Sequence, residues 1–121
     1  MVKNHKLNHN LNALLTNLPN KVVRFFYMKT GSGALREAIG TKSWDYIPAQ
    51  YYPHGEGNQT TPAHIVKYFE FNPDGTPLGW RSFSKYALIG WCDYVPGVNE
   101  AEILPYSEAD ENDDDENVNH E

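Results

Sequence analysis

The chain contains 121 residues, of which 40% are apolar and 13% aromatic, a size and composition that suit one domain with a single core. Its only cysteine, Cys92, excludes an internal disulfide and favours a reducing environment, so we expect a cytoplasmic protein. No segment approaches the roughly 20 consecutive apolar residues of a membrane helix, and the polar N-terminal residues lack the apolar stretch of a signal peptide. We therefore expect no contact with membranes.

Charge is distributed unevenly along the chain. All ten Lys and Arg residues precede Glu100, together with six acidic residues, so this part carries a net charge of +4. From Glu100 to Glu121 there are ten acidic residues and no Lys or Arg, a net charge of −10. The overall value of −6 therefore conceals a mildly basic domain with an acidic appendage.

Leucines at helical spacing mark the N-terminal segment. Within residues 3–18 they are Leu7, Leu11, Leu14, Leu15 and Leu18, with polar residues between them, which is typical of an amphipathic helix. Asn is frequent here and lowers helix propensity, so packing must stabilise the helix. Pro19 and Asn20 end the pattern, and the sequence predicts an N-terminal helical segment over residues 1–20.

A β-hairpin is predicted directly after this helix. Residues 21–29 are rich in β-branched and aromatic residues, and alternate side chains from Val23 to Tyr27 fall on one face of a strand. Residues 30–33 contain two glycines and predict a tight turn. Residues 34–41 also contain good helix formers, but the stretch between its flanking glycines is too short for a helix, so we interpret it as the second strand.

The rest of the domain predicts further strands separated by irregular segments. Residues 42–62 combine aromatic residues with Pro and Gly and form a long connection, whereas residues 64–71 predict a strand. Residues 72–79 are rich in turn residues. The β pattern resumes over residues 80–95, where a change of alternation predicts a bulge or bend near residues 82–85. Four or five short strands without intervening helices favour a small barrel of the SH3 or OB type.

Several short motifs resemble one protein family. They are VRFFY and LREAIGT in the first two strands, Tyr46-Ile47-Pro48 in the connection, and Trp80-Arg81-Ser82-Phe83 leading into Leu88-Ile89. Over roughly residues 21–92 the chain resembles the WYL-like family of Sm-like SH3 β-barrel proteins, small domains of bacteria and their phages. The resemblance implies an SH3-like barrel and a regulatory role in sensing a ligand or nucleic acid. The compact members that the chain resembles most have no established activity.

Together these patterns predict a mainly β fold with three parts. An N-terminal amphipathic helix is followed by an SH3-like (Sm-like) barrel over residues 21–98 and by a disordered acidic tail over residues 99–121. Residues 107–121 contain almost no apolar side chains, so they cannot bury enough surface to offset the entropy lost on ordering.

No set of residues predicts catalysis or metal binding. His5 and His9 would share one face of a helix, but no Cys or carboxylate lies near them at metal-ligand spacing. His54 and Glu56 form a conceivable acid–base pair in the long connection, without a recognisable nucleophile beside them. Cys92 lies late in a predicted strand and is expected to be buried rather than reactive. We therefore predict a non-enzymatic protein without a metal or cofactor.

Basic and aromatic residues are interleaved along the predicted strands. Basic side chains neutralise phosphates and aromatic faces stack with bases, so this pattern favours binding of single-stranded DNA or RNA. The residues expected to contact nucleic acid or another ligand are Arg24, Arg36, Lys42, Trp44, Lys67, Trp80, Arg81 and Lys85. The competing interpretation is that most of the aromatic residues fill the core. Three roles are open for the acidic tail: it keeps the protein soluble, it folds back on the basic face and competes with phosphate, or it mimics nucleic acid toward a basic partner.

A protein-interaction module is the alternative function. SH3-like barrels often present an aromatic groove to peptides, and residues 44–53 contain Trp44, Tyr46, Tyr51 and Tyr52. The amphipathic helix over residues 5–18 offers a second docking surface, either for a partner or for another copy of the chain. Phosphate contacts predict binding that weakens steeply with salt, whereas an aromatic groove predicts a shallow dependence.

Overall fold

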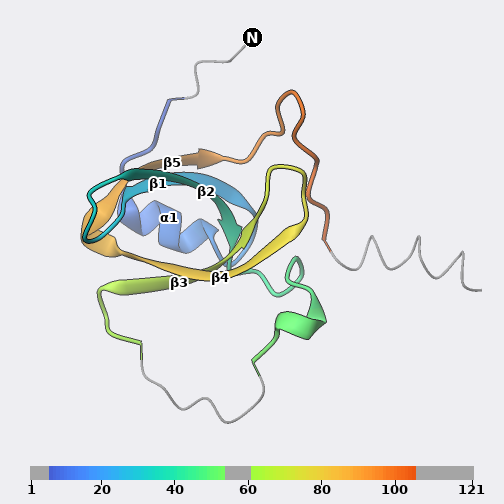
Figure 1. Ribbon diagram of the computed structural model, residues 1–121, viewed down its shortest axis with the longest axis horizontal. Helices are drawn as coiled ribbons and strands as arrows, with labels where there is room; N and C mark the ends of the chain where they lie inside the picture. The colour runs from blue at the N-terminus through green and yellow to red at the C-terminus, as the bar shows by residue number, and fades with distance from the viewer. Residues whose placement is uncertain (1–5, 54–60, 106–121) are drawn as a thin grey trace, which may run out of the picture.

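The computed structural model of the chain describes residues 6–53 and 61–105. These residues contain one α-helix and five antiparallel strands, which form one sheet in the order β4-β3-β2-β1-β5. The elements are α1 (Leu11–Asn17), β1 (Val23–Met28), β2 (Leu35–Thr41), β3 (Ile65–Phe71), β4 (Pro77–Ser84) and β5 (Leu88–Asp93), with 3₁₀ turns η1 (Ala49–Tyr51) and η2 (Lys85–Ala87). The sheet curves so that α1 lies between β1, β2 and β5 on one side and β3 and β4 on the other (Figure 1). The predicted mainly β fold is confirmed, and within the described residues the sheet is unclosed, because its edge strands β4 and β5 are not paired.

Strands β1 and β2 form the predicted hairpin. They pair in antiparallel register from Val23 opposite Gly40 onward. The turn between them holds Gly31 and Gly33 at φ values of 93° and 74°, which glycine adopts without the steric cost that a Cβ atom would impose. Side chains along β1 alternate between buried and more exposed positions, as the period-two pattern predicts.

One face of the sheet lines a core that all five strands share with α1. Its buried side chains are Leu14 of α1, Leu18 directly after α1, Val23, Phe25 and Tyr27 of β1, Ala38 of β2, Val66 and Tyr68 of β3, Phe83 of β4 and Trp91 of β5. The ring centroid of Phe25 lies 4.8 Å from that of Tyr68 and 5.2 Å from that of Phe83. Such aromatic pairs contribute about 0.5–1.5 kcal/mol beyond the area that they bury. A large share of the aromatic residues therefore serves the core.

A second apolar cluster covers the opposite face of the sheet. It consists of Val22, Ile39, Ile47, Phe69 and Phe71, with Tyr46, Tyr51, Tyr94 and Ile103 packed against it. The connection after β2 and the segment after β5 supply these covering residues. Because both faces of β3 are covered here, four consecutive residues at its end, 68–71, are buried.

The N-terminal helix is shorter than predicted. It begins only after Asn10, whose side chain accepts a hydrogen bond from the Ala13 amide at 3.1 Å. Residues 6–10 are not helical, and Asn8 forms two backbone hydrogen bonds with Trp91 of β5. Asn side chains compete for backbone groups and favour capping positions over helix interiors, which explains the late start. In the described part of the chain no helix is both long and apolar enough to cross a membrane.

The segment after β5 packs against the sheet beyond the predicted end of the domain at residue 98. Ile103 joins the second cluster, and the hydroxyl of Tyr94 donates a hydrogen bond to the Ala101 carbonyl at 2.6 Å. The Ala101 amide in turn donates to the Pro73 carbonyl at 2.9 Å. Contacts with the sheet therefore continue past residue 99, and the predicted disorder of residues 107–121 concerns residues outside the described part.

Candidate nucleic-acid interface

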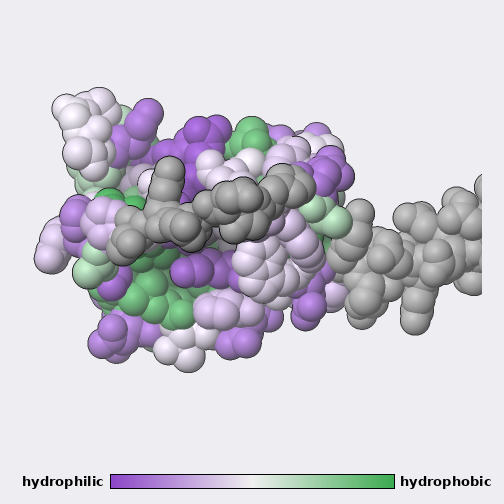
Figure 2. All heavy atoms as spheres, turned by 90° about the horizontal axis from the view of Figure 1, so that it is seen from below, coloured by the Kyte–Doolittle hydropathy of each residue, from purple (hydrophilic) through white to green (hydrophobic). Residues whose placement is uncertain are grey.

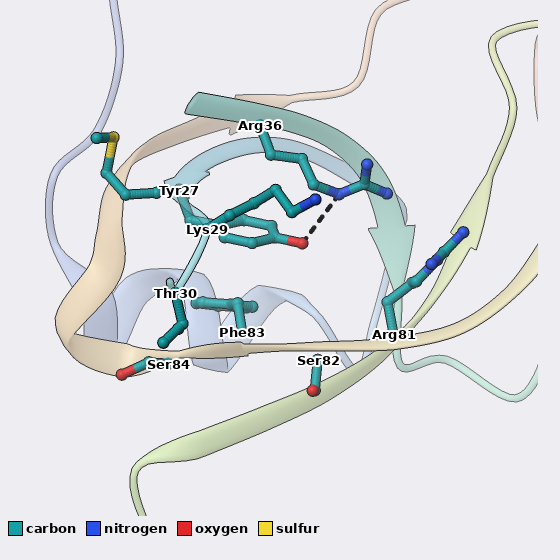
Figure 3. Close-up of a pocket in the computed structure, with 9 residues that line it drawn as sticks. Tyr27, Lys29, Thr30, Arg36, Arg81, Ser82, Phe83 and Ser84 are labelled. Atoms are coloured by element: carbon teal, nitrogen blue, oxygen red, sulfur yellow. Dashed lines mark hydrogen bonds between the residues drawn. The ribbon is translucent and has the colours of Figure 1, made fainter. Parts of the chain in front are cut away.

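A cavity lined by basic side chains opens where the β1–β2 hairpin approaches β4 (Figure 3). Its volume is about 410 Å³, and its lining residues are Tyr27, Met28, Lys29, Thr30, Arg36, Arg81, Ser82, Phe83 and Ser84. We call it the cationic pocket. Strand pairing explains how it forms, because Arg36 lies opposite Tyr27 and Arg81 lies opposite Tyr68. Both arginines thus share the face of the sheet whose other residues form the core.

A buried hydrogen-bond network holds the arginines of this pocket. The carboxylate of Glu70 pairs with the guanidinium of Arg36 and lies 3.3 Å from Nε of Arg81. Nε of Arg36 also donates to the hydroxyl of Tyr27 at 3.0 Å, and that hydroxyl lies 3.0 Å from the hydroxyl of Tyr68. Every member of the network has at least one partner, as buried polar groups require.

The network shifts the ionisation of its members. Burial lowers the pKa of Arg36, but the charge of Glu70 and the hydrogen bond to Tyr27 outweigh it and raise that pKa above its ordinary value. Burial raises the pKa of Tyr68, and its hydrogen bond with Tyr27 raises it further. Arg36 is therefore a permanent cation, and Tyr68 stays neutral throughout the physiological range.

The cationic pocket carries a positive net charge. Three cations, Lys29, Arg36 and Arg81, line it, and one carboxylate, that of Glu70, pairs with two of them. No ion pair of Lys29 occurs within residues 6–53 and 61–105. A concave site with excess guanidinium and ammonium groups suits a phosphate, since guanidinium forks match the geometry of its oxygens.

A second, wider cavity lies beside the first, and we call it the aromatic groove. Its volume is about 610 Å³, and its lining residues are Trp44, Tyr51, Pro53, Lys67, Trp80, Arg81 and Ser82. Trp44 and Trp80 remain 49% and 39% exposed, and their ring centroids lie 5.8 Å apart. Exposed aromatic rings such as these offer surfaces on which a base or a planar side chain can stack.

The connection after β2 holds the rings of this groove in place. The indole Nε1 of Trp80 donates to the Tyr51 carbonyl at 2.8 Å, and the hydroxyl of Tyr52 donates to the Trp44 carbonyl at 3.0 Å. The rings of Trp44 and Tyr52 also pack edge to face at 4.9 Å. The groove therefore belongs to the folded domain and does not depend on a ligand for its shape.

Strand β4 joins the two cavities. Arg81 and Ser82 line both of them, and along the strand they point to opposite sides, with Arg81 directed toward the cationic pocket (Figure 3). Trp80 lies opposite Phe69 on the same side as Ser82. Seen from the β3 and β4 side, hydrophobic side chains gather in limited areas between polar ones (Figure 2).

The structure brings together five of the eight expected contact residues. Arg36 and Arg81 line the cationic pocket, and Trp44, Lys67, Trp80 and again Arg81 line the aromatic groove. Lys42 and Lys85 line neither cavity.

Arg24 lies on the opposite face of the sheet. Its guanidinium pairs with Glu37 and with Glu100, the latter at 2.7 Å, and lies 5.3 Å from the ring centroid of Tyr94. Burial lowers the pKa of Arg24, but the hydrogen bonds to these two carboxylates raise it overall. Arg24 therefore ties the segment after β5 to β1, and its charge is already neutralised.

Two residues of the site were missed from the sequence. Lys29 belongs to the interleaved basic and aromatic pattern, but nothing in the pattern placed it beside Arg36 rather than in solvent. Glu70 lies in a strand whose alternate residues, Val66 and Tyr68, are buried. A carboxylate at that inward position needs a buried cationic partner, and this signal would have pointed to Glu70 and an arginine.

The described residues contain no group of three or more His, Cys, Asp or Glu side chains that could hold a metal ion. Nδ1 of His9 lies 2.7 Å from the Ile89 carbonyl outside the helix, and His5, His54 and Glu56 lie outside the described residues. Cys92 is half-buried rather than buried, and burial raises the pKa of its thiol. A thiol of that kind is a poor nucleophile at neutral pH.

Comparisons with protein-family models, with curated protein sequences and with solved structures found no match for this chain.

Proposed function

We propose that this chain is a small, non-enzymatic binding module that contacts single-stranded DNA or RNA through the cationic pocket and the aromatic groove. One observation carries the proposal: the cationic pocket and the aromatic groove with its two exposed Trp rings adjoin and share Arg81 and Ser82. Single-strand binders combine these two elements, a positive site for the backbone and aromatic faces for the bases.

The ligand would cross β4 from one cavity to the other. A phosphate in the cationic pocket meets Arg36, Arg81 and Lys29, and a neighbouring base stacks on Trp80 or Trp44. Each stacked base contributes about 1–3 kcal/mol in single-strand binders. Stacking accepts any base, so this arrangement supports binding with little sequence preference.

The proposal includes an SH3-like barrel of the Sm-like kind and membership of the WYL-like family. A single core shared by all five strands of one curved sheet supports the barrel, because barrel closure requires one face of every strand to point inward. The family rests on the short motifs between residues 21 and 92, and a regulatory role in bacteria or their phages follows from it.

Removal of the charge shared by both cavities tests the proposed function. Binding of a fluorescently labelled oligo-dT or oligo-U is measured by fluorescence anisotropy at low salt, with the wild type and Arg81→Gln. The variant should bind about five- to tenfold more weakly, and the slope of log K against log salt should become shallower by about 0.7, the value for one lost phosphate contact on a single strand.

Lys42→Gln is the matched control, since it removes one exposed basic charge that lines neither cavity. It should change the affinity less than about twofold, because one charge outside both cavities acts on the ligand only at long range and is screened at moderate salt. Equal losses in the two variants would indicate diffuse electrostatic attraction and contradict the proposed site, and so would failure of the wild type to bind either oligonucleotide.

A protein-interaction module remains the second candidate, and the aromatic groove favours it. Exposed Trp rings beside a proline suit a peptide as well as a base. The helix supports this alternative less, because Leu14 of α1 and Leu18 directly after it are fully buried in the core. A partner whose affinity stays nearly constant with salt and is lost in Trp80→Ala but kept in Arg81→Gln would favour the peptide.

A further inference from the structure

The two arginines of the cationic pocket are held to different degrees. Two interactions hold Arg36: it forms an ion pair with Glu70, and its Nε donates a hydrogen bond to the Tyr27 hydroxyl at 3.0 Å. Arg81 has only the contact of its Nε with Glu70 at 3.3 Å within the described residues, and its side chain is 47% exposed against 27% for Arg36. Arg81 is therefore the cation that can turn toward a ligand at lower cost.

The carboxylate of Glu70 interacts with the two arginines as a bound anion would. The Glu70 side chain is 6% exposed and is not among the residues that line the cationic pocket. One oxygen, Oε1, accepts a hydrogen bond from Arg36 and forms the ion pair with Nε of Arg81. A carboxylate that bridges two guanidinium groups satisfies them in the way that a phosphate oxygen would.

We propose that the carboxylate of Glu70 competes with the phosphate of the ligand for Arg81 and thereby sets the affinity of the site. Arg81 is the residue that exchanges one partner for the other. This inference rests on the proposed function and names the regulation of the same site. In the free protein Glu70 keeps the two guanidinium groups paired. When a phosphate enters, Arg81 turns from Glu70 to the phosphate oxygens, whereas Arg36 stays bound to Tyr27 and Glu70.

Replacement of the competitor tests this inference. Glu70→Gln keeps the size of the side chain and an acceptor oxygen but removes its charge, so the net charge of the pocket region rises by one. With the full chain and the oligo-dT probe, Glu70→Gln should bind at least about fivefold more tightly than the wild type at low salt, since partly buried charges are only partly screened. The salt dependence should steepen by up to about 0.7, because Arg81 becomes available for one more phosphate.

Glu37→Gln is the matched control. It makes the same change of charge at a carboxylate that pairs with Arg24 on the opposite face of the sheet. Affinity should stay within about twofold of the wild type, because this carboxylate faces Arg24 and does not line the cationic pocket. Tighter binding by Glu37→Gln to the same extent would overturn the inference, because overall charge alone would then explain the gain.

The remaining outcomes separate the two proposals. If the wild type binds and a folded Glu70→Gln binds equally or more weakly, Glu70 positions the arginines and does not compete, so the inference fails and the proposed function stands. If neither chain binds oligo-dT or oligo-U, the proposed function fails and the inference fails with it.

A measurement on the wild type covers the case in which Glu70→Gln does not fold. Nuclear magnetic resonance of the arginine Nε–Hε groups follows both arginines during titration with the oligonucleotide. The Arg81 signal should shift substantially and the Arg36 signal should shift little. Comparable shifts of both signals, or a shift of Arg36 alone, would overturn the exchange at Arg81.

Discussion

The two arginines of the β1–β2 hairpin have different roles because their side chains point to opposite faces of the sheet. Arg24 of β1 points to the outer face, where two carboxylates and the ring of Tyr94 neutralise it. Arg36 of β2 points to the inner face, where it lines the cationic pocket. Side chains alternate between the faces of a strand, so a slip of one residue in either strand would move its arginine to the other face of the sheet.

Gly40 in β2 is required for close packing rather than for backbone freedom. A Cβ atom at this position would lie 2.5 Å from Cδ2 of Tyr68 and 3.0 Å from the Phe69 carbonyl oxygen. We predict that Gly40→Ala destabilises the protein by roughly 1–3 kcal/mol, the usual cost of overpacking a core. Urea unfolding followed by circular dichroism measures the change in the free energy of unfolding.

The control for this prediction is Gly97→Ala. The nearest atom to a Cβ at Gly97 is Oε1 of Glu100 at 3.6 Å, an ordinary contact. Its free energy of unfolding should change by less than about 0.5 kcal/mol. A Gly40→Ala variant as stable as the wild type would show that the Tyr68 ring moves aside freely, contrary to the tight packing argued for this core.

At the scale of elements, the segment after β5 is tied to the sheet by one carboxylate. Glu100 pairs with Arg24 at 2.7 Å and accepts a hydrogen bond from the Gly97 amide at 2.9 Å. Burial raises the pKa of Glu100, but the Gly97 amide and Arg24 outweigh it and hold that pKa below its ordinary value. The charged form of Glu100 is therefore the form that stabilises the fold.

This shift predicts an acid-sensitive contribution to stability. Because the pKa is lower in the folded than in the unfolded protein, Glu100 contributes stability that is fully present above the unfolded value of about 4.3 and is lost as the pH falls through the folded value. Glu100→Gln should therefore be less stable than the wild type at neutral pH, and the difference should shrink below about pH 4. Thermal unfolding as a function of pH measures it.

Glu102→Gln is the control, since Glu102 is exposed and makes no ion pair within residues 6–53 and 61–105. Its unfolding temperature should follow that of the wild type across the pH range. A difference between Glu100→Gln and the wild type that persists unchanged in acid would assign the effect to packing rather than to the charge.

Elements whose signal is local could be predicted from the sequence, and those fixed by distant partners could not. The hairpin of β1 and β2 and the strand β3 follow from alternation and turn glycines, which depend on near neighbours. The start of α1 depends on Asn10 as a cap and on the pairing of Asn8 with Trp91, 83 residues away in the sequence. The segment after β5 looked like part of the acidic tail because its contacts with β1 and the second cluster are all long-range.

The candidate site, too, could be predicted from the sequence only in part. The alternation of basic and aromatic residues indicated eight contact residues, and five of them, including Arg36, Trp80 and Arg81, lie around two adjoining cavities. Their separation into a phosphate site and a stacking site depends on which face each residue occupies. That information comes from the register between β3 and β4, which hydrophobic alternation within one strand does not specify.

At the scale of the whole molecule, charge is separated between a basic domain and an acidic C-terminal segment. Residues before Glu100 carry a net charge of +4 and those from Glu100 onward carry −10. Glu100 already pairs with Arg24 on the outer face. The carboxylates beyond it are therefore candidates to compete with phosphate for the cationic pocket, in the way proposed for Glu70 within the fold.

We predict that deletion of residues 107–121 tightens binding of oligo-dT severalfold at low salt. The deletion removes carboxylates that the chain holds near the site at a high local concentration, where they compete with the phosphates of the ligand. Screening weakens this competition, so the gain should disappear at high salt, where the Debye length falls to about 3 Å. Fluorescence anisotropy over a range of salt concentrations measures both effects.

A tail of equal length with every Asp and Glu of residues 107–121 replaced by Asn and Gln separates charge from chain length. If competition is electrostatic, this neutral tail should match the deletion in affinity and in salt dependence. If the deletion and the neutral tail both bind like the wild type, the tail does not compete, and a loss of solubility in both would assign it a solubilising role. A gain in the deletion but not in the neutral tail would mean that the tail obstructs the site by its bulk, so that its acidity would serve another purpose.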